Sequence, residues 1–261
     1  VAGIPDQIIQ YTGGISYPIC GHSIGSAFGD LDNDGHIDLL AGNFSHPSED
    51  QDRPQFLRNM GPEGNFHFED KSGTAGLAWQ ESFASPTLGD FDNDGDLDLF
   101  YTTVYGHNYP VLYQNEGDWH FTDITEESGL SKLGPTYQAA WADIDNDGDL
   151  DLCTAEKIFI NDNTSGNWLK IRLLGDGKMV NHSAIGSQVR IRLGDTVYTR
   201  EVESGTGEGN QNDPPLHFGF GAYNGPVTLE ISWLGGYKQT TANVKINRHI
   251  LVRFNRYLTR K

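Results

Sequence analysis

The sequence has few cysteines and no long apolar run. Cys20 and Cys153 are too few for a disulfide scaffold, and the sequence leaves open whether they pair or stay buried thiols. No stretch reaches the roughly 20 consecutive apolar residues of a membrane-spanning helix, so we expect no membrane span. The chain opens at Val1 without a methionine, which suggests a removed signal peptide or a shortened chain.

Basic residues are scarce in the first part of the chain. Residues 1–166 carry 29 acidic and 5 basic side chains, whereas residues 167–261 carry 7 acidic and 13 basic ones. This step predicts two domains, 1–166 and 167–261. The acidic part would repel a phosphate backbone, so nucleic acid is excluded as a partner. A solvated acidic surface does not explain this charge, because 14 of the 29 acids lie in three short loops.

The three loops belong to an internal repeat with spacings of 60 and 53 residues. Each loop has the pattern Asp-x-Asp-Asn-Asp-Gly-x-x-Asp, and the copies lie in residues 29–40, 89–100 and 142–153. Downstream of each loop, a short apolar stretch ends in asparagine, at residues 56–59, 112–115 and 158–161. Short strands separated by turns, with a period of about 50–60 residues, are typical of propeller blades.

The loops have the chemistry of calcium sites. Ca²⁺ takes roughly six to eight oxygen ligands from carboxylates, carbonyls and water. Aspartates at loop positions 1, 3, 5 and 9 bring four carboxylates together, position 7 offers a backbone carbonyl, and glycine at position 6 permits the sharp turn. The predicted ligands of the three Ca²⁺ sites are Asp30, Asp32, Asp34, His36 and Asp38, then Asp90, Asp92, Asp94, Asp96 and Asp98, then Asp143, Asp145, Asp147, Asp149 and Asp151. Without a cation these carboxylates repel one another, so we expect an empty loop to be poorly ordered.

Other kinds of metal site fit the loops less well. An EF-hand needs Glu at position 12, where the chain has Ala41, Tyr101 and Thr154, and the flanks are strand-like rather than helical. Zinc is disfavoured because the loops offer neither cysteine nor a clustered histidine pair. Magnesium is less suited to an all-carboxylate cage. The remaining alternative is a set of acidic turns that hold no metal.

The second part of the chain alternates apolar with polar residues. This pattern occurs at residues 168–174, 188–193, 196–202, 227–233 and 250–254. Such alternation indicates half-buried antiparallel strands, so we expect a small β-sandwich. The outward-facing basic residues are interpreted as a solvated sheet face. The alternative is that they dock against the acidic repeats or an anionic glycan.

Both parts resemble known families. The loop units resemble FG-GAP (VCBS) repeats, the calcium-loop blades of integrin α-chain propellers and of many bacterial secreted proteins, and the aspartates at positions 1, 3, 5 and 9 match that motif. His36, Asp96 and Asp149 stand where the family uses a main-chain oxygen. The motifs at residues 167–169, 184–186, 213–221 and 229–234 resemble the ASPIC/UnbV domain, which commonly ends FG-GAP proteins similar to the cartilage acidic protein family. The resemblance implies a fold and calcium binding, but not an activity.

Several motifs that suggest catalysis are better explained by structure. Residues 21–25 fit Gly-x-Ser-x-Gly, but the first loop begins too soon for the helix that a nucleophile Ser23 would need. Residues 205–209 are glycine-rich, yet they contain Glu208 and no lysine, so a turn is predicted rather than a phosphate cradle. His217 is interpreted as a hydrogen-bonded structural histidine.

The surface carries further candidate features. Asn43, Asn163 and Asn181 begin glycosylation sequons, which agree with a secreted glycoprotein. Four aromatic residues either bind glycan or, as we favour, pack within and between the blades: Trp79, Tyr105, Tyr109 and Trp119.

We therefore predict an all-β protein in which partial propeller-like calcium-binding blades precede a small β-sandwich. Three units do not close a ring. Either residues 7–11 and 15–17 donate strands, or the chain is a piece of a longer protein, or copies assemble to share blades.

The predicted function is that of a secreted, calcium-stabilised binding or structural module. Its expected partners are copies of itself, in an oligomer or filament, or another extracellular protein or glycan. The alternative is a propeller-type enzyme, a lyase or related, that acts on a carbohydrate or a small carbonyl compound. That alternative requires a pocket with convergent polar groups, for instance where the repeats meet the sandwich.

Overall fold

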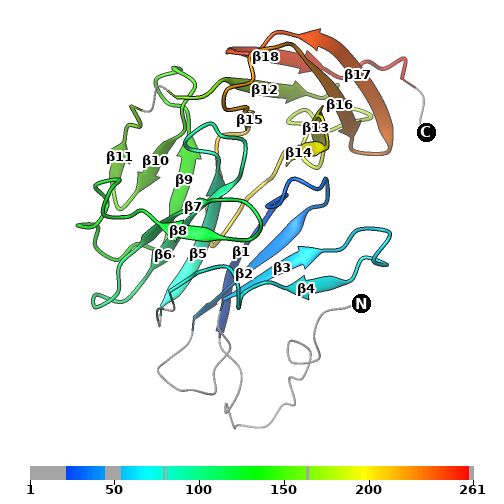
Figure 1. Cartoon of the computed structure of the whole chain (residues 1–261). Coiled ribbons are helices and arrows are strands. Elements are labelled where there is room, and N and C mark those ends of the chain that lie inside the picture. Colours follow the sequence, from blue (N-terminus) through cyan, green and yellow to red (C-terminus); the bar gives the residue numbers. More distant parts are fainter. Residues whose placement is uncertain (1–21, 45–53, 79, 81, 163–164, 259–261) are drawn as a thin grey trace.

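The computed structural model describes residues 22–44, 54–78, 80, 82–162 and 165–258. These residues form 18 strands and no helix, which confirms the predicted all-β class (Figure 1). No helix among them is long and apolar enough to cross a membrane. Residues 7–11 and 15–17, which we considered as strand donors, lie outside the described ranges.

The repeats form three antiparallel sheets, here called blades 1 to 3. Blade 1 contains β1 (His22–Gly29), β2 (Asp38–Phe44), β3 (Gln55–Asn59) and β4 (Phe68–Asp70). Blade 2 contains β5 (Phe83–Gly89), β6 (Asp98–Thr103), β7 (Val111–Asn115) and β8 (Phe121–Asp123). Blade 3 contains β9 (Ala139–Ala142), β10 (Asp151–Thr154) and β11 (Lys157–Phe159). Each Asp-rich loop joins the first two strands of its blade, so we call them loops 1, 2 and 3.

The blades pack with their first strands side by side, β1 and β2 against β5, and β5 against β9. Close packing requires a small residue just before each loop. A Cβ on Gly29 would lie 2.7 Å from Leu88 Cδ1, and one on Gly89 would lie 2.7 Å from Trp141 Cγ. Ala142 stands at the same place in blade 3, which no further blade of the described chain follows. The third copy can therefore have alanine in place of glycine, because among the described residues no neighbouring blade packs against this position.

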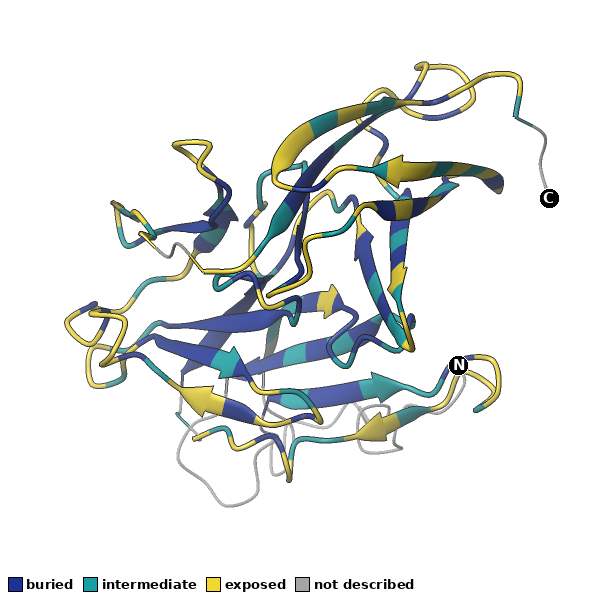
Figure 2. Cartoon of the chain, turned by 45° about the horizontal axis from the view of Figure 1, so that its top comes forward, coloured by how far each residue is buried: buried dark blue, intermediate teal, exposed yellow. Residues whose placement is uncertain are grey.

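Two apolar cores lie between the blades. Phe56, Leu99 and Phe121 belong to the core of blades 1 and 2, whereas Leu112, Trp141 and Leu152 belong to the core of blades 2 and 3. All residues of β5 and β6 are buried, so these two strands of the middle blade are covered on both faces. Figure 2 shows this burial in the central strands and the exposure of the outer turns.

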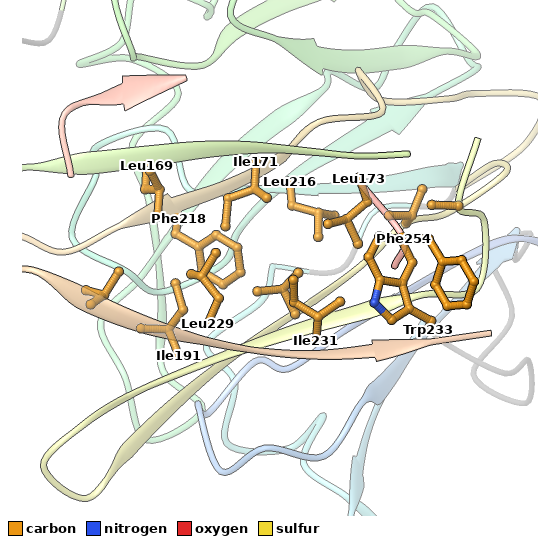
Figure 3. Close-up of a cluster of buried hydrophobic side chains, with 14 of the residues drawn as sticks. Leu169, Ile171, Leu173, Ile191, Leu216, Phe218, Leu229, Ile231, Trp233 and Phe254 are labelled. Carbon is orange, nitrogen blue, oxygen red and sulfur yellow. The ribbon is translucent and has the colours of Figure 1, made fainter. Parts of the chain in front are cut away.

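The rest of the chain forms a β-sandwich, as predicted. One sheet contains β15 (Leu216–Gly219), β12 (Trp168–Leu174) and β18 (Arg248–Arg253), with β18 parallel to β12. The other contains β14 (Thr196–Glu201), β13 (Gln188–Leu193), β16 (Val227–Trp233) and β17 (Tyr237–Val244). Figure 3 shows Leu169 and Ile171 of the first sheet facing Leu229 and Ile231 of the second.

The sandwich lies at the loop end of the blades (Figure 1). Its segment 204–213 runs down along the first strands of all three blades. Gly207 N donates to Ser26 O at 2.7 Å, Glu208 N to Ser85 Oγ at 2.7 Å, and Asp213 N to Trp141 O at 2.9 Å. The turn predicted at residues 205–209 is present, closed by an antiparallel bridge between Thr206 and Asn210. The sandwich therefore covers inner blade surface that an incomplete ring would leave open.

Candidate metal centres

The last aspartate of each loop fastens the loop to its blade. One carboxylate oxygen accepts a hydrogen bond from the backbone N–H at loop position 2, and the other accepts from the backbone N–H of an asparagine at the end of the downstream apolar stretch. In loops 1, 2 and 3 these bonds join Asp38 to Leu31 and Asn59 (2.9 and 2.8 Å), Asp98 to Phe91 and Asn115 (3.1 and 2.9 Å), and Asp151 to Ile144 and Asn161 (2.8 and 2.9 Å). The aspartates at position 5 accept from the backbone N–H of position 7, so they close the turn.

Each loop brings three carboxylates together. Candidate ligand atoms lie within 4.8 Å of one another in Asp30, Asp32 and Asp38, in Asp90, Asp92 and Asp98, and in Asp143, Asp145 and Asp147. The predicted ligands therefore converge at positions 1, 3 and 9 in loops 1 and 2, and at positions 1, 3 and 5 in loop 3. Three acidic groups that could hold a metal ion are present, as the sequence indicated.

Burial makes the carboxylates of loops 1 and 2 unfavourable without a counter-ion, whereas Asp145 and Asp147 of loop 3 are exposed. Burial raises the pKa of Asp30 to about 7 and that of Asp38 to about 8, and nearby carboxylates add to both shifts. It also raises the pKa of Asp90 to about 7. Within the described residues, Asp32 Oδ1 and Asp90 Oδ1 are buried and have no hydrogen-bond partner. Buried oxygens of this kind fit an oxygen-seeking cation such as Ca²⁺.

The loops are bonded to one another through asparagines. Asn33 Nδ2 donates to Asp96 Oδ1 at 2.5 Å, and Asn93 Nδ2 donates to Asp149 Oδ1 at 2.6 Å, so each loop holds the next. At position 7 only a main-chain oxygen was expected to matter. The side chains of Asp96 and Asp149 at this position also bind the preceding loop. In loop 1, which no other loop precedes within the described chain, His36 stands at position 7 and contacts Asp34 instead, at 2.9 Å.

A second series of bonds repeats the connection. Asn115 Nδ2 donates to Leu31 O at 3.0 Å, and Asn161 Nδ2 donates to Phe91 O at 2.7 Å, each reaching the preceding loop. The repeat pattern places these asparagines at the end of each apolar stretch but does not indicate their role. Their recurrence at matching places in the repeat was the signal that could have found them.

The sandwich contacts every loop. Gly219 N donates to Asp90 Oδ2 at 2.8 Å, and Arg200 Nη2 donates to Gly95 O at 3.0 Å in loop 2. Arg190 Nη2 donates to Gly35 O in loop 1 at 2.6 Å. Lys170 Nζ lies 3.3 Å from Asp143 Oδ2 in loop 3.

The interpretation of the basic residues as a solvated face is therefore wrong for Lys170, Arg190 and Arg200. They dock against the acidic loops, because a half-buried sheet face with positive charge complements buried carboxylates. Arg192 and Arg253 are exposed, as that interpretation predicted.

A cavity of about 510 Å³ lies where the blades meet the sandwich. Its lining includes Trp141, Lys170, Arg200, Glu203 and His217. Lys170 and Arg200 are bound to the loops, and His217 Nε2 contacts Asn93 Oδ1 at 2.7 Å, which confirms a hydrogen-bonded structural histidine. Glu203 is the acidic residue among these five. Burial raises the pKa of its carboxyl group to about 7, and the nearby carboxylate of Glu201 adds to the shift.

The structure also places the candidate glycan-binding aromatic residues and the candidate nucleophile Ser23. Trp119 is buried, as the packing interpretation predicted, and its Nε1 donates to Asp32 Oδ2 at 3.0 Å. Tyr109 is exposed and Tyr105 stacks on His107, whereas Trp79 lies outside the described residues. Ser23 lies within β1 rather than at a strand-to-helix turn.

The sequons and cysteines are only partly within the described chain. Asn43 is buried, which argues against glycosylation there, and Asn181 is exposed. Cys153 is half-buried. Asn163 and Cys20 lie outside the described residues.

Comparison with known proteins identifies both parts of the chain. An FG-GAP-like repeat model matches residues 30–101 and 90–154, and an ASPIC and UnbV model matches residues 177–256. Cartilage acidic protein 1 of Homo sapiens is 24% identical over 239 residues, which cover 85% of this chain and 34% of that protein. The Xenopus tropicalis protein is 23% identical over 243 residues, covering 87% of this chain and 36% of that protein. The chain thus spans about a third of the length of the curated relatives it matches.

Proposed function

We propose that this chain, which contains FG-GAP-like repeats and an ASPIC and UnbV domain, is a secreted extracellular module held rigid by Ca²⁺ at its three loops. The observation that carries the proposal is the convergence of three carboxylates in each loop, largely buried in loops 1 and 2, at the place where the blades meet one another and the sandwich. Ca²⁺ bound there supplies the positive charge that these carboxylates need. The loop–loop and loop–sandwich bonds then make each metal site a fastening point of the whole junction.

The magnitude of the repulsion supports this proposal. Two ionised carboxylates about 4.8 Å apart repel by roughly 3 kcal/mol at an effective dielectric constant of about 20. Three such pairs in loop 1 or loop 2 approach about 10 kcal/mol, which is comparable to the whole stability of a typical domain. A loop therefore either keeps protons on its aspartates or binds a cation. At extracellular calcium concentrations the cation is the better solution, since it also uses the unpartnered oxygens of Asp32 and Asp90.

Removal of calcium tests the proposal. A ligand that binds only the folded state raises the melting temperature, so EDTA is expected to lower it and excess CaCl₂ to restore it. Elemental analysis of the purified protein should give up to three calcium ions per chain. An unchanged melting temperature in protein shown to be free of metal would refute the structural role of calcium.

The partner that we propose is a second copy of the chain, bound through blade 3. Blades 1 and 2 have four strands each, whereas blade 3 has three, and within the described residues no strand pairs with the outer side of β11. Next to this edge, Ile158 is 58% and Ile160 is 49% exposed. An open edge with apolar side chains is a template for pairing with another strand.

Light scattering in calcium tests the self-association. We expect a dimer or larger species, and Ile158→Lys should weaken it because a charge blocks edge pairing. Leu251→Lys, on the exposed face of the sandwich, is the matched control and should leave it unchanged. A monomer at high protein concentration would contradict self-association and direct the search to another protein or a glycan.

A second candidate function is the binding of a small polyhydroxylated compound in the junction cavity. Glu203 favours it, because a carboxyl group that is protonated near neutral pH can donate a hydrogen bond to a sugar hydroxyl. Monosaccharides added at millimolar concentration are expected to shift the indole resonance of Trp141 in the wild-type protein and not in Glu203→Leu, whose side chain cannot donate a hydrogen bond. If none of the monosaccharides shifted the Trp141 resonance in the wild-type protein, this candidate function would be refuted.

A further inference from the structure

One position of the repeat carries a different kind of side chain in each blade. This residue precedes the asparagine that fastens the loop, so it occupies the same place in each repeat. It is Arg58 in blade 1, Gln114 in blade 2 and Ile160 in blade 3. The loops themselves share the aspartates at positions 1, 3, 5 and 9, and their charged residues differ only at position 7, where loop 1 has His36.

Arg58 and Gln114 hold the same oxygen of the aspartate at loop position 3. Arg58 Nε lies 2.6 Å from Asp32 Oδ2, and Gln114 Nε2 donates to Asp92 Oδ2 at 2.7 Å. Arg58 also reaches position 5, where its Nη2 donates to Asp34 Oδ2 at 3.1 Å. Ile160 has no polar group to offer. A guanidinium, an amide and a hydrocarbon thus stand at equivalent places.

The sandwich also supplies cations to loops 2 and 3, but at longer distances from the candidate ligands than Arg58 has in loop 1. Arg200 Nη2 is 3.9 Å from Asp90 Oδ2, and its hydrogen bonds go to backbone carbonyls. Lys170 Nζ is 3.3 Å from Asp143 Oδ2 and is shared with Asp213 at 3.0 Å. His249 Nε2 lies 3.4 Å from the same Asp143 oxygen. Only in loop 1, among the described residues, does a cation from the same blade pair directly with two aspartates of the loop, Asp32 of the converging group and Asp34 beside it.

We propose that Arg58 is a built-in cation of loop 1, so that this loop binds Ca²⁺ more weakly than loops 2 and 3 and keeps its fold when it holds none. The inference rests on the proposed role of calcium. Asp32 Oδ1 is buried and unpartnered, so Arg58 leaves the site open to a metal. The guanidinium opposes a divalent cation by charge repulsion, which in partly buried surroundings is little screened by salt. It also neutralises the carboxylates in the absence of metal.

A pair of reciprocal substitutions tests the proposal. Calorimetric titration of the metal-free full chain with CaCl₂ is expected to show two tighter sites and one that is at least about tenfold weaker. Arg58→Gln gives loop 1 the residue of loop 2, and it should tighten the weak site by about tenfold or more. Gln114→Arg is the converse and should weaken one of the tighter sites.

Melting temperatures distinguish a counter-ion from a purely structural arginine. Arg58→Gln should melt lower than the wild-type protein in EDTA, and at the same temperature or higher in saturating CaCl₂. A residue with only a packing role would lower the melting temperature in both conditions. Three equal affinities in the wild-type protein, or an unchanged weak site in Arg58→Gln, would refute the inference and leave the calcium proposal intact. No calcium binding at any site would refute both.

Discussion

Replacement of Asn93 by alanine is expected to destabilise the protein far more than replacement of Asn146, although both lie in the sequence Asp-Asn-Asp-Gly. Asn93 Nδ2 donates to Asp149 Oδ1 at 2.6 Å, and its Oδ1 contacts His217 Nε2 at 2.7 Å. Asn146 is exposed, and its Nδ2 donates to Ile144 O only in a long contact of 3.5 Å. Asn33 is intermediate, because its Nδ2 donates to Asp96 Oδ1 at 2.5 Å, whereas its Oδ1 has no hydrogen-bond partner in the described part of the chain.

The magnitudes follow from these contacts. All three asparagines have positive φ, at 53°, 62° and 63°, so alanine carries a similar backbone penalty of about 1 kcal/mol in each loop. That penalty is the whole effect expected for Asn146→Ala. Loss of a hydrogen bond to a charged group adds about 1.5–3 kcal/mol, which brings Asn33→Ala to about 3 kcal/mol. Asn93→Ala also leaves His217 buried and unpaired, which adds about 1–3 kcal/mol and gives about 5 kcal/mol in total.

Urea unfolding in saturating calcium measures the series. Two-state behaviour should be checked by the slope of each transition, since the chain has two structural units. Because the backbone penalty is shared, subtraction of the Asn146→Ala value isolates the side-chain bonds. If Asn93→Ala and Asn146→Ala agreed within about 1 kcal/mol, the inferred bonds between the loops and with the sandwich would not contribute to stability.

Further predictions concern pH, charge and packing at the junction. In EDTA the melting temperature should fall between pH 5 and pH 8. Burial raises the pKa of Asp38 to about 8 in the folded state, whereas its pKa in the unfolded chain is about 4. Below about pH 4 both states hold the proton, and between these values only the folded state does, so stability is lost as the pH rises through about 8. In saturating CaCl₂ this fall should be absent, and a rise with pH in EDTA would contradict the reasoning. Lys170→Met leaves the buried carboxylate of Asp143 poorly compensated and should cost about 3 kcal/mol in EDTA but less in CaCl₂, measured by urea midpoints against the exposed control Arg192→Met. Gly148→Ala should cost about 3 kcal/mol, because its Cβ would lie 1.8 Å from Trp168 Cε2. The control Gly129→Ala also has positive φ but open space around it, so it should cost about 1 kcal/mol. Equal urea midpoints for the two variants would show that Trp168 moves freely.

The sequence by itself determined the features that are local. A loop of nine residues contains all of its own candidate ligands, so the grouping of Asp30, Asp32 and Asp38 follows from the loop pattern alone. The strands follow in the same way, because alternation and turn residues act over a few positions. The all-β class, the blades, the sandwich and the acidic clusters could therefore be predicted.

The tertiary structure decided everything that joins distant residues. Asn93 lies 56 residues from Asp149 and 124 from His217, and its contacts depend on how three blades and a sandwich pack together. Three identical asparagines thus have three different surroundings. Lys170 shows the same limit: its alternating strand predicts a solvated face, and only the docking of the sandwich places it against Asp143. Sequence pattern fixes which groups a segment offers, whereas packing alone selects the groups they meet.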